Sequence, residues 1–119
     1  MRKLGQIISD RGSKYAVSGC PVSTRSEVDA ALKALKTKKA YARATHNIWG
    51  VLLTRHGPLK ADDGESGAGM VILRMLEREG LADHLVVVTR WYGGKHLGGD
   101  RFRHVQACVR GYLDALSDA

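Results

Sequence analysis

The opening of the chain alternates short apolar runs with turn residues, which predicts a β-hairpin. The run LGQIIS (residues 4–9) favours a first strand and KYAVSGCPV (residues 14–22) a second, because the turn residues DRGS (residues 10–13) separate them. Pro21 has no backbone N–H to donate to a neighbouring strand. We therefore expect the second strand to end at Pro21 or to lie at a sheet edge.

A helical repeat of apolar positions follows the hairpin. Its stripe is formed by Val28, Ala31, Leu32 and Leu35. The start is marked by Thr24 and Glu27, whose spacing fits a capping box that satisfies free backbone N–H groups of the first turn. Cations gather beyond the stripe, at Lys33, Lys36, Lys38, Lys39 and Arg43. They form either a solvated helix end that suits the negative end of the helix dipole or an anion-binding face.

Two more helices are predicted by the same periodicity. One covers residues 68–80 and ends at Gly80, a suitable left-handed C-cap; its core stripe is Ala68, Ile72, Met75 and Leu76. Met70, Val71 and Leu73 widen its apolar surface, so this helix is buried on two sides or meets a partner. The other starts near Asp100, and its stripe is Phe102, Val105, Val109, Tyr112, Leu113 and Leu116.

Two apolar runs between the helices predict strands. THNIWGVLLT (residues 45–54) favours one, and HLVVVTRWY (residues 84–92) favours a central strand, because it lacks polar alternation. Residues 55–67 read as a loop. The order strand, strand, helix, strand, helix, strand, helix predicts one α+β domain over residues 1–119, with helices packed on a mainly antiparallel sheet.

Charge and composition narrow the classes of function. The chain of 119 residues has 19 Lys and Arg against 12 Asp and Glu, a formal net charge of +7, which favours polyanionic partners. No apolar run approaches the roughly 18 to 20 residues of a membrane span, and the N-terminus lacks the apolar core of a signal peptide, so we expect a cytoplasmic location. Cys20 and Cys108 are far apart, which predicts reduced thiols and no structural zinc.

The segment RWYGGKHLGGDRFRH (residues 90–104) has the context of an anion cradle, namely strand, glycine-rich turn and helix start. Gly93 and Gly98 match the first half of a P-loop. The second half fails, because positions 99 and 100 are Gly and Asp where a P-loop has Lys and then Ser or Thr. We interpret Asp100 as the helix N-cap, and the glycines as a sharp turn packed close to DDGESGAG (residues 62–69).

The same segment carries a ridge of hydrogen-bond donors. The candidate nucleic-acid-binding residues are Arg90, Lys95, His96, Arg101 and Arg103, with His104 beside them. Trp91 and Tyr92 lie among these cations, an arrangement suited to stacking unpaired bases while cations neutralise the backbone. The alternative is that the aromatic rings fill the core beneath the turn and the charges face water. Both interpretations stay open, although strand alternation favours only one inward ring.

Acidic residues gather in the stretch ADDGESGAG (residues 61–69). Asp62, Asp63 and Glu65, with His46 nearby, could hold a hard cation and serve a metal-assisted phosphoester hydrolase. The other interpretation is structural, because acids before a helix suit its dipole and could anchor Arg90 or Arg101. A protein–protein interaction module that uses the Met70, Val71 and Leu73 face is a further alternative.

Three motifs together resemble the IMPACT/YigZ family: ATHNIWG (residues 44–50), DDGESGAG (residues 62–69) and VVVTRWYGGKHLGGDRF (residues 86–102). The last motif is more similar to the eukaryotic IMPACT branch. The resemblance implies a two-layer α/β sandwich like the second domain of small-subunit ribosomal protein five. It also implies a non-enzymatic role in the regulation of translation and stress response. The implied partners are RNA, the ribosome or a ribosome-associated activator of the starvation-response kinase.

The resemblance carries over a motif surface and no catalytic residue, metal or cofactor. The motif positions are His46, Asp62, Asp63, Gly64, Glu65, Arg90, Tyr92, Gly93, Gly94, Leu97 and Gly98. Our leading expectation is a binding domain that contacts RNA or the ribosome through the ridge at residues 90–103.

Overall fold

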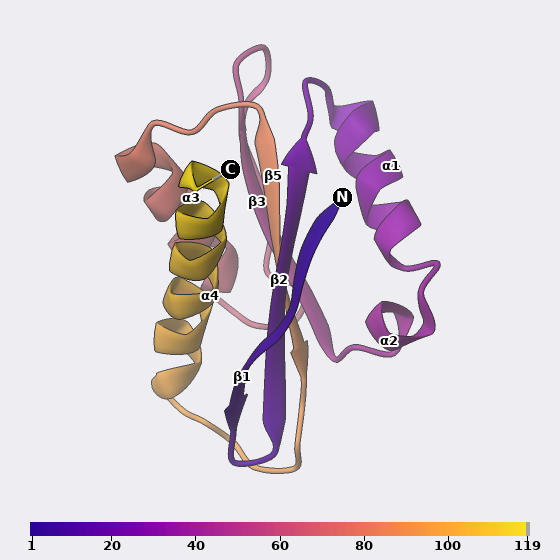
Figure 1. The fold of residues 1–119 in the computed structure, drawn as a ribbon, viewed down its shortest axis with the longest axis vertical. Helices are drawn as coiled ribbons and strands as arrows, with labels where there is room; N and C mark the ends of the chain where they lie inside the picture. Colours follow the sequence, from indigo (N-terminus) through magenta and orange to yellow (C-terminus); the bar gives the residue numbers. More distant parts are fainter. Residues whose placement is uncertain (119) are drawn as a thin grey trace.

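The computed structural model describes residues 1–118 and contains one five-stranded sheet in the order β1-β2-β5-β3-β4 (Figure 1). Every neighbouring pair of strands is antiparallel. The elements along the chain are β1 (Arg2–Asp10), β2 (Ser13–Pro21), α1 (Arg25–Leu35), α2 (Lys39–Ala42), β3 (His46–Leu53), β4 (Gly57–Ala61), α3 (Ala68–Glu79), β5 (His84–Trp91) and α4 (Asp100–Ser117). The predicted α+β class with helices on an antiparallel sheet is confirmed.

The sheet has a different core on each face. Helices α3 and α4 pack on one face, where Tyr15 and Val88 of the sheet meet Ile72 and Val109 of the helices. Helix α1 covers part of the opposite face over Val87 and its neighbours, so it adds a partial third layer (Figure 1). Strand β5 lies in the middle of the sheet, and every residue from His84 to Arg90 is buried, as its unbroken apolar run predicts.

Strand β4 corrects the prediction of a loop over residues 55–67. Residues 57–61 pair with the end of β3, from Leu53 opposite Gly57 to Trp49 opposite Ala61. Pro58 concealed this strand from sequence reasoning, because proline is depleted in strands. Proline is tolerated here because β4 lies at the sheet edge, where one side of the backbone needs no partner. The short helix α2 was also missed; four residues are too few to show a helical repeat.

The predicted starts of α1, α3 and α4 and the predicted end of α3 are confirmed, but the predicted N-cap of α4 is not. Thr24 and Glu27 form the expected capping box, and Gly80 closes α3 in the left-handed conformation. The N-cap of α4 is Gly99, without a side-chain cap, so the interpretation of Asp100 as N-cap is wrong. Asp100 lies one position inside the helix, and its carboxylate accepts hydrogen bonds from Arg11 and Arg103 instead.

The first half of the glycine-rich loop packs on the β1–β2 turn and not on the acidic stretch. A Cβ atom added to Gly93 would lie 2.0 Å from the backbone carbon of Gly12, so no other residue fits there without movement of the hairpin. The second half of the loop does approach the acidic stretch, because Leu97 and Gly98 border the same pocket as Gly64. The expected packing is therefore correct for only part of the loop.

The apolar surface of α3 is mostly used within the fold. Leu73 is buried and Val71 is half-buried, whereas Met70 is exposed. A protein–protein face built on these three residues is therefore reduced to the single side chain of Met70. Among residues 1–118, no helix has the length and apolar character needed to cross a membrane.

Candidate functional site

A buried carboxylate, Glu65, lies at the centre of the candidate site. Its Oε2 accepts a hydrogen bond from Arg90 Nη1 at 2.7 Å, and its Oε1 accepts one from Arg101 Nη1 at 3.2 Å. The turn that carries Glu65 is closed by two backbone bonds, from Glu65 N–H to the Asp62 carbonyl and from Ala68 N–H to the Glu65 carbonyl. Each oxygen of one carboxylate therefore holds a different guanidinium group.

Arg90 lies at the end of β5 and is buried, with 4% of its surface exposed. Its Nη2 donates to Ser13 Oγ at 3.3 Å, and its guanidinium carbon lies 5.6 Å from the ring centroids of both Tyr15 and Tyr92. The placement of Arg90 in an exposed ridge is therefore wrong. A charged group enters the interior here because a carboxylate partner is available beside it.

The other two acids of the stretch also have structural partners. Asp62 accepts backbone hydrogen bonds from Gly67 at 3.1 Å and Gly69 at 2.8 Å, and Asp63 accepts one from the backbone of Asn47 at 2.7 Å. Burial alone would raise the pKa of Asp62, but the two backbone N–H groups and nearby Lys60 bring that pKa below its usual value. These bonds cap the start of α3 and tie it to β3.

The arrangement does not support the metal-assisted hydrolase interpretation. Asp63 and Glu65 are engaged by backbone N–H groups and arginines, which occupy the oxygens that a cation would need. Within residues 1–118, no group of three or more His, Cys, Asp or Glu side chains has the geometry to hold a metal ion. The structural interpretation of the acidic stretch is the correct one, and it includes the expected anchoring of both Arg90 and Arg101.

His46 belongs to the same cluster. Its Nδ1 lies 2.8 Å from the backbone carbonyl oxygen of Asp63, so this nitrogen carries the proton, because a carbonyl can only accept. Its Nε2 lies 3.6 Å from Glu65 Oε2. Gly64 packs against the imidazole, and a Cβ atom at Gly64 would lie 3.2 Å from Nδ1. The ring is thereby fixed at the wall of an open pocket.

This pocket, which we call the Glu65 pocket, joins the acidic stretch to the glycine-rich loop. It has a volume of about 460 Å³ and is lined by Thr45, His46, Gly64, Glu65, Arg90, Tyr92, His96, Leu97, Gly98 and Arg101. Several predicted motif positions therefore meet at one place. Asp62 and Asp63 lie outside the lining and support it, and Gly93 and Gly94 also lie outside it. The volume falls in the range of small-molecule sites.

The remaining predicted basic residues differ in solvent exposure and in whether they pair with a carboxylate. Lys95 and His96 are exposed. The side chain of Arg103 is 72% exposed and pairs with Asp100 at 2.7 Å, whereas that of Arg101 is 36% exposed and lies over the Phe102 ring. His104 bonds to Asp10 at 2.7 Å and its ring contacts that of Tyr15 at a tilt, so it belongs to the packing between α4 and the hairpin.

The two aromatic residues of the loop have different roles. Trp91 is half-buried, and its Nε1 donates to the backbone carbonyl of Ala40 at 2.7 Å, while its ring meets the edge of Tyr41. Tyr92 is 41% exposed and contacts His96. Trp91 therefore packs against α2, and Tyr92 is the more exposed of the two rings. Stacking of bases on Tyr92 stays a prediction.

Sequence reasoning missed residues that reach the site from elsewhere in the chain. Ser13 Oγ lies within hydrogen-bonding distance of both Arg90 Nη2 and the Gly93 backbone N–H. Thr45 Oγ accepts the backbone N–H of Tyr92 at 2.9 Å. Thr45 lies in the ATHNIWG motif but was not among the predicted positions, and Ser13 lies in no such motif; both bond across 47 to 80 positions of sequence separation. Only the strand order brings them together.

Comparison with known proteins gives consistent matches along the chain. A model of the Impact N-terminal domain matches residues 11–113. Over 118 residues the chain is 36% identical to the Protein IMPACT homolog of Caenorhabditis elegans, covering 92% of this chain and 45% of that protein. Over 114 residues it is 39% identical to Protein IMPACT of Xenopus laevis, covering 92% of this chain and 36% of that protein. The chain thus spans less than half the length of these relatives.

Solved structures give the same picture of the fold. A crystal structure described as that of a hypothetical protein superposes with a TM-score of 0.81 at 21% identity, over 90% of this chain and 54% of the other. The structure of the two-domain translational regulator Yih1 superposes with a TM-score of 0.55 at 31% identity, over 87% of this chain and 42% of the other. The first match supports the fold alone, and the second also carries a described role for the protein compared.

Proposed function

The chain belongs to the Impact N-terminal domain family, and from this premise we propose that it regulates translation as a binding domain for RNA on the ribosome. Support for the translational part comes from Yih1, which is described as a two-domain translational regulator. The matched relatives are animal proteins, which is consistent with the similarity of the last motif to the eukaryotic branch. Because the relatives are longer, the role of a whole protein is part of this proposal.

The observation that carries the RNA-binding part is a set of basic side chains beside an exposed aromatic ring. Lys95, His96 and Arg103 are exposed and Arg101 is half-buried, and they lie on the loop and the first turn of α4, next to Tyr92. Arg90 is left out of the contact surface because it is buried. Bases can stack on such a ring while cations neutralise phosphates.

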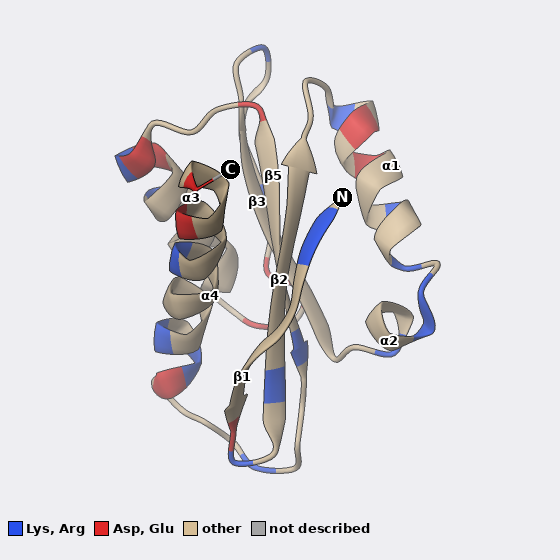
Figure 2. Cartoon of the chain, viewed as in Figure 1, with Lys and Arg blue, Asp and Glu red and all other residues tan. Residues whose placement is uncertain are grey.

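The distribution of charge supports the same surface. The formal net charge is +7, and such an excess promotes association with a polyanion through counterion release. Figure 2 shows Lys and Arg on the glycine-rich loop, at the start of β2 and in the connection between α1 and α2. Acidic residues near the loop, Asp10 and Asp100, are already bonded to Arg11. Asp100 also pairs with Arg103, and Glu65 pairs with Arg101, whereas the described residues include no carboxylate paired with Lys95.

The test is co-sedimentation with ribosomes over a series of salt concentrations. We expect the affinity to fall steeply with salt, with a logarithmic slope of about 0.7 to 0.9 for each phosphate contact. A triple variant, Lys95→Ala with Arg101→Ala and Arg103→Ala, is expected to bind more weakly and to show a smaller slope. The matched control removes three exposed cations elsewhere, Lys33→Ala with Arg55→Ala and Arg74→Ala, and is expected to retain most binding.

Two outcomes would reject RNA binding through this surface. One is a flat response to salt. The other is equal loss of binding by the triple variant and its control, which would assign the effect to net charge alone. Capture from cell lysate with and without ribonuclease separates the partners, because binding to a ribosome-associated protein survives digestion of the RNA and binding to RNA does not.

A further inference from the structure

The Glu65 pocket contains two arginine side chains whose hydrogen bonds are incomplete. Arg90 and Arg101 both line it, and each has a buried Nε that finds no acceptor among residues 1–118. The Arg90 side chain is 95% buried, since only 5% of it is exposed. A buried donor without a partner is uncommon in folded proteins and calls for an explanation, such as a bound ion or an ordered water. Two of them at one pocket indicate an acceptor ligand.

The local charge determines which kind of acceptor fits. Glu65 takes one N–H from each arginine, so these three side chains together keep one formal positive charge. His46 and His96 line the same space and add no negative charge. A cation would meet two guanidinium groups, and a neutral ligand would leave the excess charge uncompensated. The pocket therefore favours an anion with several oxygen atoms.

The start of α4 adds no free backbone donor to the pocket. The helix is 18 residues long, and although its N-cap, Gly99, has no side chain, the N–H groups of Asp100, Arg101 and Phe102 donate to the carbonyls of Leu97, Gly98 and Gly99. Leu97 and Gly98, which lead into this turn, line the pocket. The carboxylate of Asp100 is bonded to Arg11 at 2.6 Å and to Arg103 at 2.7 Å. The donors that the pocket can offer an anion are therefore its arginine side chains.

We infer that the Glu65 pocket binds a phosphate monoester of mononucleotide size, with the phosphate at Arg101 and Arg90. The volume of about 460 Å³ exceeds that of a phosphate group alone. The exposed ring of Tyr92, beside His96, provides a surface on which a base can stack. The ligand is either a free nucleoside monophosphate or the phosphorylated end of an RNA. This inference does not depend on the proposed role in translation.

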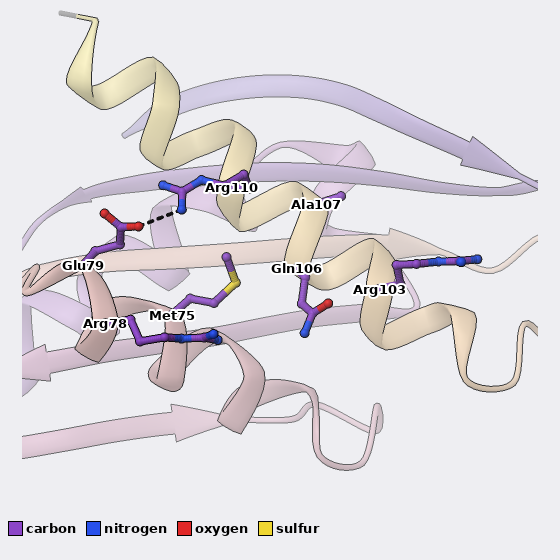
Figure 3. Close-up of a pocket in the computed structure, with 7 residues that line it drawn as sticks. All are labelled: Met75, Arg78, Glu79, Arg103, Gln106, Ala107 and Arg110. Atoms are coloured by element: carbon purple, nitrogen blue, oxygen red, sulfur yellow. Dashed lines mark hydrogen bonds and ion pairs between the residues drawn. The ribbon is translucent and has the colours of Figure 1, made fainter.

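A second concave surface shows why the first is distinctive. The groove between α3 and α4 has a similar volume, about 470 Å³, and is lined by Met75, Arg78, Glu79, Arg103, Gln106, Ala107 and Arg110 (Figure 3). Its arginine donors already have partners, because Arg110 bonds to Glu79 and Arg103 bonds to Asp100. Neither Arg103 nor Arg110 has a buried unpaired nitrogen. The groove therefore supplies a matched control on the same helix.

The experiment measures binding by titration calorimetry with inorganic phosphate, adenosine 5′-monophosphate and adenosine, at constant ionic strength set by chloride. We expect the monophosphate to bind more tightly than phosphate, and adenosine to bind more weakly than either. Arg101→Gln should weaken binding of the monophosphate about tenfold or more, because it removes charge-assisted hydrogen bonds. Arg110→Gln, nine positions further along α4, should leave that affinity within about twofold, because Arg110 lines the other groove.

Further arms identify the source of the phosphate and guard against unfolding. Short RNAs with a 5′-phosphate or a 5′-hydroxyl group separate the end of an RNA from a free nucleotide. Arg101→Lys keeps the charge and the fold but lacks Nε, so we expect an intermediate affinity. The inference fails if adenosine binds as well as its monophosphate, if Arg101→Gln and Arg110→Gln have equal effects, or if phosphate binds no better than chloride. Ribosome co-sedimentation that persists in any of these cases would leave the proposed function intact.

Discussion

Two glycine-containing segments of this chain, one acidic and one basic, have opposite roles. Both precede a helix: residues 62–67 lead into α3, and residues 93–99 lead into α4. In the first, Asp62 reaches forward to satisfy the backbone N–H groups of Gly67 and Gly69 at the start of α3. In the second, Gly99 caps α4 without a side chain, and the nearby cations reach solvent or a pocket. The first segment stabilises the start of α3, and the second exposes the basic side chains of Lys95 and His96.

This difference separates stability from binding. Substitutions that break the acidic segment or its contacts should destabilise the protein. Substitutions of exposed cations on the basic segment should leave stability intact and affect ligands. Glu65 connects the two roles, because it belongs to the first segment but accepts a hydrogen bond from Arg101, which follows the second. Substitutions in both segments test this separation of stability from binding, from the largest expected effect to the smallest.

Glu65→Ala should have the largest effect. It leaves the buried guanidinium of Arg90 without its carboxylate partner, and loss of one partner of a buried pair costs about 3–5 kcal/mol. The free energy of unfolding from urea titration measures this loss. Glu77→Ala removes an exposed carboxylate on α3 and should change the same quantity by less than about 0.5 kcal/mol. Equal effects of the two substitutions would show that Arg90 is not held by Glu65.

Gly93→Ala should be the next largest. The new Cβ would lie 2.0 Å from the backbone carbon of Gly12, so the loop or the hairpin must move, and overpacking of this kind costs about 1–3 kcal/mol or more. Gly111→Ala, in the middle of α4, meets only an ordinary contact of 3.6 Å to Ile7. It should stabilise by about 0.5–1 kcal/mol through helix propensity. A smaller loss at position 93 than at 111 would contradict the packing described.

Features set by neighbouring residues were predictable, and features set by strand order were not. The capping box at Thr24 and Glu27, the Gly80 cap and the central strand β5 each depend on local chemistry that periodicity and spacing reveal. The role of Asp100 was predicted wrongly because its partner Arg11 lies 89 positions away. The link between Glu65 and Arg90 was one of two open interpretations, since composition cannot decide between a cation and an arginine as the partner of a carboxylate.

Removal of the α3 cap should have a moderate effect that depends on pH. Asp62→Asn should cost about 1 kcal/mol near neutral pH, because a neutral amide accepts the Gly67 and Gly69 N–H groups less strongly. The pKa of Asp62 is lower in the folded protein than its usual value of 3.8, owing to those N–H groups and Lys60 despite the opposing effect of burial. The stabilisation is therefore fully present above pH 3.8 and is lost as the pH falls through the folded pKa.

Thermal unfolding of both proteins between neutral pH and about pH 2.5 measures this dependence. The difference in midpoint between the original chain and Asp62→Asn should be constant at higher pH and shrink below the usual carboxyl pKa. A difference that stays constant down to the lowest pH would mean that the ionised carboxylate contributes nothing to the cap.

Lys95→Ala should have the smallest effect on folding and is the sharpest test of the comparison. Lys95 is exposed, and the described residues include no carboxylate paired with it, so the free energy of unfolding should change by less than about 0.5 kcal/mol. The logarithmic salt slope of ribosome binding should nevertheless fall by about 0.7 to 0.9 if one phosphate contact is lost. Lys33→Ala on α1 is the matched control, with the same charge change and no expected change in slope. Stability and binding are measured on the same two variants. A slope that falls equally in both would mean that Lys95 makes no specific phosphate contact. A loss of stability in Lys95→Ala would mean that Lys95 has a structural role.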